Sequence, residues 1–189
     1  MKEFNFDKVN DIQDHLDKHQ YIADRNLSTS LFLALKMKKP IFLEGEPGVG
    51  KTEVGKVLAK IMNTDLIRLQ CYEGLDVHNS IYEWNYSRQI LQIRMMELEG
   101  KVNKKTITDE IFGSKFLIKR PLYKAIDYSG KFPPVLLIDE LDRADEEFEA
   151  FLLEILSDYQ ISIPEIGTIK CDKPPIVVIT SNRTREVHD

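Results

Sequence analysis

The fold of this chain is decided by the stretch Gly45-Glu46-Pro47-Gly48-Val49-Gly50-Lys51-Thr52, which fits the phosphate-binding pattern G-x-x-x-x-G-K-[ST] without a mismatch. The apolar run Pro40–Leu43 precedes it and predicts a strand. Apolar side chains after it recur at i, i+3, i+4 and i+7, the spacing of one helix face: Val54, Val57, Leu58 and Ile61. A strand, a glycine loop and a helix in this order are the context in which the pattern binds nucleotide.

The residues of this loop suit different parts of a nucleotide. Glycines let successive backbone N–H groups point inward around phosphate, and the N-terminus of the following helix adds a partial positive charge. We expect the Lys51 ammonium to reach the β- and γ-phosphates and the Thr52 hydroxyl to ligate Mg²⁺. The loop therefore predicts a nucleotide bound with Mg²⁺. The residues expected to contact nucleotide here are Glu46, Pro47, Gly48, Val49, Gly50, Lys51, Thr52 and Glu53.

A second signature is the apolar run 135–138, which is followed by Asp139 and Glu140. It predicts a buried parallel strand whose polar residues emerge at the carboxyl end, where open α/β sheets bind ligands. Asp139 is suited to hold the Mg²⁺ shell, and Glu140 to act as general base towards the attacking water. The alternative is that both acids only begin the next helix, where carboxylates suit the helix dipole.

A third element is the β-branched run 175–180, which ends in Ser181 and Asn182. An asparagine at a strand tip beside the two acids could form hydrogen bonds to both the γ-phosphate and the lytic water. Asparagine is also common in the polar turns that follow strands, so the motif is weak by itself. Its value lies in the order of the three motifs along the chain.

That order resembles the AAA+ ATPases, with residues 45–52 as Walker A, residues 136–140 as Walker B and Asn182 as sensor 1. The resemblance covers the chain from about residue 20 onward. Softer phrases resemble the MoxR-type branch, in particular the CoxD-like relatives linked to carbon monoxide dehydrogenase maturation. These phrases are Tyr72-Glu-Gly-Leu-Asp76, Leu137-Ile-Asp-Glu-Leu-Asp-Arg-Ala-Asp145 and Thr180-Ser-Asn-Arg-Thr-Arg185.

The resemblance implies an α/β fold, the three-layer P-loop sandwich with a parallel sheet. The strands are expected near 40–44, 66–70, 135–139 and 176–181, and the family's order puts the first beside the last, with 135–139 next. Apolar periodicity predicts further helices near 7–18, 27–38 and 87–99, the last one stopped by Gly100. Alternating isoleucines predict a hairpin over 160–170, which matches one that MoxR-type proteins carry at this point.

The resemblance also assigns roles to residues. Lys51, Glu140 and Asn182 become the catalytic set of an ATP hydrolase, and Thr52 and Asp139 the metal-binding pair. Tyr21 and Ile22 occupy the place where the family cups adenine, although both residues could instead belong to the core.

The family works as rings, so the resemblance implies a homo-oligomer, a hexamer when complete. It also implies chaperone-like remodelling of a protein client, such as a metalloenzyme being matured. Residues 1–189 are expected to form one AAA+ core, a large subdomain that stops after sensor 1, before the arginine finger and the lid. Weak turnover follows from that expectation. A nucleotide-binding scaffold or fragment that does not hydrolyse ATP is the alternative.

Composition agrees with these expectations and excludes some classes of protein. A chain of 189 residues with 42% hydrophobic content can bury one substantial core. A net charge of −5 and a pI near 5.5 argue against a nucleic-acid-binding domain. Two cysteines favour a reducing, cytoplasmic setting over a disulfide scaffold, and the sequence shows no apolar stretch of membrane-spanning length.

Overall fold

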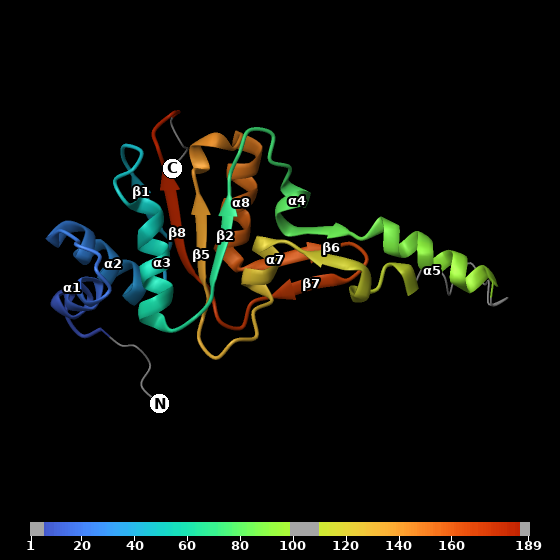
Figure 1. Cartoon of the computed structure of the whole chain (residues 1–189), viewed down its shortest axis with the longest axis horizontal. Helices are drawn as coiled ribbons and strands as arrows, with labels where there is room; N and C mark the ends of the chain where they lie inside the picture. Colours follow the sequence, from blue (N-terminus) through green and yellow to red (C-terminus); the bar gives the residue numbers. More distant parts are fainter. Residues whose placement is uncertain (1–5, 99–109, 186–189) are drawn as a thin grey trace.

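The computed structural model describes residues 6–98 and 110–185, and within them a four-stranded parallel sheet has the order β1–β8–β5–β2 (Figure 1). Its strands are β1 (Ile41–Glu44), β2 (Leu66–Gln70), β5 (Val135–Asp139) and β8 (Ile176–Ser181). The predicted fold class, strand positions and strand order are therefore confirmed. The motif-bearing strands β5 and β8 lie at the centre of the sheet, and β1 lies at an edge.

Strand β5 is buried along its whole length because helices cover both faces of the sheet. Its alternate side chains Val135 and Leu137 pack in one core with α1 (Val9–Lys18), α2 (Arg25–Met37) and α3 (Lys51–Met62). Leu136 and Ile138 pack in the other core with α7 (Pro121–Ile126) and α8 (Glu146–Asp158). Because alternate side chains of β5 point to opposite faces of the sheet, the strand contributes to both cores. The fold therefore has three layers, with the sheet between two layers of helices.

Aspartates fix where two of these helices begin. The Asp24 side chain accepts a hydrogen bond from the Leu27 N–H at 2.7 Å, and this N-cap starts α2 two residues before the predicted position. Asp145 caps α8 in the same way, through the Phe148 N–H at 2.8 Å. The side chains that the sequence assigns to the inner face of α3 are all buried: Val54, Val57, Leu58 and Ile61.

Two antiparallel strand pairs lie beside the sheet in the described residues. The predicted hairpin is present as β6 (Gln160–Ile163) and β7 (Gly167–Lys170). The other pairs β3 (Tyr82–Trp84) with β4 (Leu117–Lys119) and was not predicted, because its strands are short and lie far apart in the sequence. Figure 1 shows both strand pairs, with α4 (Val77–Ile81) and α5 (Tyr86–Leu98), extending to one side of the sheet. The predicted helix stop at Gly100 lies outside the described residues.

The described residues also contain two short 3₁₀ turns, η1 (Ser114–Phe116) and η2 (Leu141–Arg143). The second turn follows β5 directly and links it to α8, so it lies at the carboxyl end of the sheet. Within residues 6–98 and 110–185, no helix is both long enough and apolar enough to cross a membrane.

Candidate functional site

Hydroxyl groups from two elements converge on one carboxylate at the carboxyl end of the sheet. Asp139, the last residue of β5, is only 2% exposed. Its Oδ1 accepts a hydrogen bond from the Thr52 hydroxyl at 2.9 Å and another from the Thr180 hydroxyl at 2.6 Å. Thr52 lies in the first turn of α3 and Thr180 lies near the end of β8. The structure therefore brings together Thr52 and Asp139, the two residues predicted to bind the metal.

The second oxygen of the same carboxylate binds an arginine. Arg68 on β2 donates to Asp139 Oδ2 from Nε at 3.0 Å and from Nη2 at 2.5 Å. Arg68 is placed for this pair because Gln70, two residues further along β2, is in register with Asp139. An ionised carboxylate has about four acceptor positions, and these four hydrogen bonds fill them.

Glu140 is held in an unusual backbone conformation. Its φ of 58° lies in the left-handed region, which costs a residue with a side chain about 1–2 kcal/mol. The Glu140 N–H donates to Thr180 Oγ1 at 3.0 Å, so one hydroxyl joins both acids of the motif. The Glu140 carboxylate pairs with Arg143 Nε at 2.8 Å. The group predicted to act as base thus has a cationic partner one turn away in the sequence.

Asn182 is fastened to the same region through its backbone. Its N–H donates to Asp142 Oδ1 at 3.0 Å, and Asp142 Oδ2 accepts from the Thr184 N–H at 3.1 Å and from the Thr184 hydroxyl. Burial of Asp142 raises its pKa, but the hydrogen bonds from Thr184 and Asn182 outweigh burial and hold the pKa below its usual value. Asp142 therefore anchors the loop that carries Asn182 beside the end of β5.

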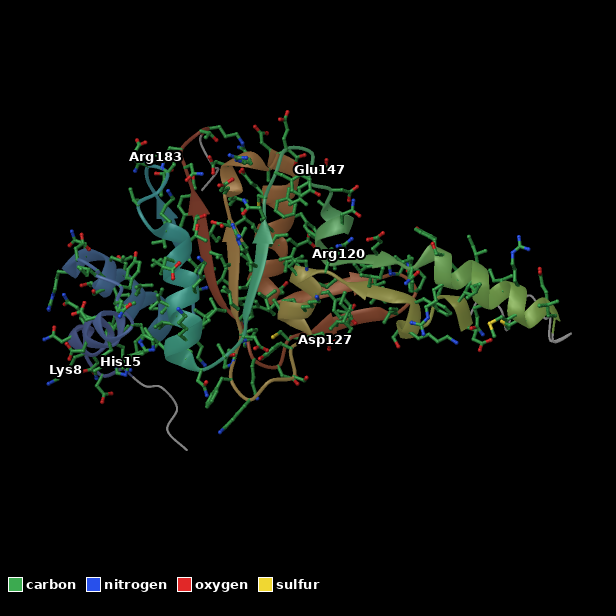
Figure 2. All side chains as sticks on the ribbon, in the orientation of Figure 1. Lys8, His15, Arg120, Asp127, Glu147 and Arg183 are labelled. Carbon is green, nitrogen blue, oxygen red and sulfur yellow. The ribbon has the colours of Figure 1, made fainter. Side chains whose placement is uncertain are left out.

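Two arginines after Asn182 hold the same loop in place. Arg183 pairs with Glu44 at the end of β1, with Nε and Oε2 2.9 Å apart, and Figure 2 labels it at this end of the molecule. Arg185 donates to the Glu149 carboxylate and to the Ala144 carbonyl. The loop is thereby tied to both β1 and α8.

The phosphate loop between β1 and α3 is more open. Gly48 and Gly50 have φ values of 83° and 93°, a region that favours glycine. Lys51 Nζ donates to the carbonyls of Gly45 at 2.6 Å and Glu46 at 2.7 Å. An ammonium group held against a glycine loop, at the N-terminus of a helix, is well placed to bind a phosphate group. With the Thr52–Asp139 pair beside it, this donor set fits a nucleotide bound with Mg²⁺.

The other predicted contact residues surround the loop at different depths. Glu46, Pro47 and Val49 are exposed, and Glu53 pairs with Lys56 at 2.8 Å on the first turns of α3. Tyr21 lies against the loop, since a Cβ built on Gly50 would meet its ring at 3.7 Å. Ile22 is 94% exposed and points to solvent. Of the two adenine candidates, Tyr21 is thus the one beside the glycines, and Ile22 is excluded from the core.

Sequence reasoning missed four residues at this site, Arg68, Asp142, Arg143 and Thr180, although the last three lie within the quoted phrases and Arg68 lies in the predicted strand 66–70. Thr180 carried a usable signal, because a hydroxyl near the tip of a strand lies on the same face of the sheet as the side chain level with it on the neighbouring strand. Arg68 also interrupts the apolar pattern of β2. Neither signal identifies Asp139 as the partner, because that contact depends on the register of the strands.

A comparison with known families matches residues 40–189 to the AAA domain of the dynein-related subfamily. A Lon protease from Amoebophilus asiaticus is 31% identical over 145 residues, which is 75% of this chain and 14% of that relative. A crystal structure of a predicted ATPase from Cytophaga hutchinsonii is 23% identical, with a TM-score of 0.59 over 95% of this chain and 45% of that one. This chain thus spans less than half the length of either relative, and the second likeness concerns the fold.

Proposed function

The chain belongs to the AAA domain family, dynein-related subfamily, and from this premise we propose that it binds ATP with Mg²⁺ and hydrolyses it. The observation that carries the proposal is the junction of Thr52, Asp139 and Thr180 beside the phosphate loop. A hydroxyl at the start of the loop helix, hydrogen-bonded to a carboxylate at the tip of the central strand, matches the metal-holding pair of P-loop ATPases.

Each side chain has a distinct part in the proposed reaction. Lys51 would leave the two loop carbonyls and donate to the β- and γ-phosphates, and Thr52 and Asp139 would hold the Mg²⁺ shell. When bound, Mg²⁺ neutralises charge that develops on the phosphate oxygens. Glu140 takes a proton from the attacking water, and Asn182 orients that water and the γ-phosphate.

Arg143 engages one oxygen of the Glu140 carboxylate, Oε2, and competes with an attacking water for that oxygen. The 2.8 Å ion pair therefore supports a resting state in which the base is withheld until nucleotide binds. The same ion pair favours the second candidate function, a module that binds nucleotide without turnover. Hydrolysis requires Glu140 to leave Arg143 when nucleotide binds, whereas binding without turnover does not.

Steady-state ATP hydrolysis tests the proposal. Glu140→Gln keeps the shape of the side chain and removes the base, so turnover is expected to fall by about 10²–10⁴-fold while ATP binding persists. Glu147→Gln is the matched control, because Glu147 is an exposed acid on the first turn of α8 (Figure 2). Wild-type turnover in Glu140→Gln would place the base elsewhere. Binding without turnover in the unmodified chain would favour the second candidate.

We further propose that residues 1–189 form an AAA+ core of the MoxR-type branch, resembling the CoxD-like proteins, that assembles as a ring and remodels a protein client. The three phrases quoted above and the β6–β7 hairpin at the predicted position support the branch assignment. A metalloenzyme under maturation is the client class that the resemblance suggests. Light scattering with and without ATP tests the assembly, and a monomer at every concentration would contradict a ring of this chain.

A further inference from the structure

Arg68 forms an ion pair for which neither the motifs nor the proposed reaction gives a reason. Its guanidinium donates two hydrogen bonds to Asp139 Oδ2, and Nη2 also donates to the Gln70 side chain. The Asp139 side chain is 2% exposed, whereas that of Arg68 is 48% exposed. Two N–H groups directed at one buried oxygen make this contact stronger than a typical surface ion pair.

The partners of Asp139 differ in how readily they can leave. Thr180 is buried and also accepts the Glu140 N–H, so its departure would break two hydrogen bonds at the end of the sheet. Thr52 can keep donating its proton to Oδ1 while its oxygen ligates a metal. Arg68 alone of these three partners is half exposed, on an edge strand, with solvent into which it can move.

Charge also makes Arg68 the partner that must leave. A guanidinium and a hydrated divalent cation that share one carboxylate repel each other, and each needs the acceptor positions of the same oxygen. Before a metal arrives, Arg68 offsets the cost of burying an ionised Asp139. After it arrives, the metal supplies that charge.

We propose that Arg68 is a built-in counter-cation of Asp139, holding Oδ2 while metal is absent and releasing it when Mg²⁺ and nucleotide bind. Arg68 therefore acts through Asp139 as a positioning residue, and it sets the Mg²⁺ concentration at which nucleotide binding tightens. Gln70 holds the guanidinium in place and shifts the balance towards the metal-free pair. The inference rests on the proposed function, because it requires a Mg²⁺-dependent nucleotide site.

The test is titration of a fluorescent ATP analogue at a series of Mg²⁺ concentrations. In Arg68→Gln the competitor is gone, so the half-saturating Mg²⁺ concentration is expected to fall about tenfold, which corresponds to about 1.4 kcal/mol. An unchanged or higher Mg²⁺ requirement, with normal nucleotide binding, would overturn the role of Arg68 alone. A wild-type chain that binds no nucleotide would overturn the proposed function and this inference with it.

Two further variants test whether the change in Mg²⁺ requirement is specific to the Arg68–Asp139 pair. Arg120→Gln breaks an exposed ion pair with Glu83, and Figure 2 shows Arg120 beside the two antiparallel strand pairs instead of at the strand tips, so the Mg²⁺ requirement should not change. Gln70→Ala keeps every charge and frees the guanidinium, and a smaller decrease in the same direction is expected. Should Arg68→Gln fail to fold, as judged by thermal unfolding in EDTA, Gln70→Ala decides the matter, and no decrease would contradict the proposal.

Discussion

The two halves of the candidate site differ in how completely the protein itself satisfies their charges. At the tips of β5 and β8, Asp139 and Glu140 pair with arginines, and Asp142 accepts hydrogen bonds from the loop after β8. In the phosphate loop, Lys51 donates only to carbonyls of its own loop, and two glycines carry positive φ values.

The difference shows which half depends on a ligand. A buried network holds its dipoles in place before any substrate arrives, as the proposed metal and water chemistry would require. The Lys51 ammonium has weaker partners in backbone carbonyls than phosphate offers, so the proposed nucleotide would complete the loop. Variants of the loop should therefore alter affinity, and variants of the strand tips should alter stability or metal dependence.

Lys51→Ala should produce the largest effect on binding. It removes the ammonium from the phosphates, and a charge-assisted hydrogen bond contributes about 1.5–3 kcal/mol, so ATP affinity should fall by about ten- to a hundredfold. Calorimetry measures this change. Lys60→Ala is the matched control on the same helix, since Lys60 is an exposed lysine in the last turn of α3, at the end away from the loop. Equal ATP affinity in Lys51→Ala and wild type would refute the phosphate-loop assignment.

Asp142→Asn should affect stability instead. The amide keeps one acceptor oxygen but turns an N–H₂ group towards N–H donors, so the free energy of unfolding should fall by about 1–2 kcal/mol at pH 7. Urea unfolding monitored by circular dichroism measures it. A stability equal to that of wild type would show that the loop after β8 does not depend on this carboxylate.

The difference in unfolding free energy between wild type and Asp142→Asn is expected to depend on pH. The folded pKa of Asp142 is lowered relative to about 3.9 in the unfolded chain, so its ionisation stabilises the fold fully above about pH 4. That contribution is lost as the pH falls through the folded pKa. The stability gap between wild type and Asp142→Asn should therefore narrow below pH 4, and a gap that widens there would have the wrong sign.

The smallest expected effect concerns the rate at which the buried thiol of Cys71 is alkylated. Burial, followed by the charges of Asp139 and Asp142, raises the pKa of Cys71 to about 12. Cys71 is buried, whereas Cys171 is partly exposed. At pH 8, iodoacetamide should therefore label Cys171 first and Cys71 only after unfolding, as peptide mass spectrometry can show. Equal labelling rates in the native protein would mean that the strand tips open readily.

Much of the fold was predictable because its signals are local. The phosphate loop, the apolar run before Asp139 and the hairpin at 160–170 each carry their own pattern within about ten residues. The strand order followed from the family resemblance. The start of α2 was predicted two residues late because the cap at Asp24 was not recognised.

The partners within the site were not predictable, because they join residues far apart in the sequence. Arg68 reaches Asp139 across 71 positions and only through the register of β2 on β5. Asp142 meets Asn182 across 40 positions, through two loops whose conformations no local pattern encodes. Sequence motifs thus indicate which groups a reaction needs, and the tertiary fold decides which groups hold them.

The most direct test of the nucleotide site is calorimetric titration of ATP into wild type and Asp139→Asn, each in Mg²⁺ and in EDTA. Asp139→Asn keeps the phosphate loop and removes the charge that holds the metal shell. The two proteins should bind ATP with similar affinity in EDTA, and only wild type should bind it more tightly when Mg²⁺ is added. The same gain from Mg²⁺ in Asp139→Asn would contradict a metal–nucleotide site at the junction of Thr52, Asp139 and Thr180.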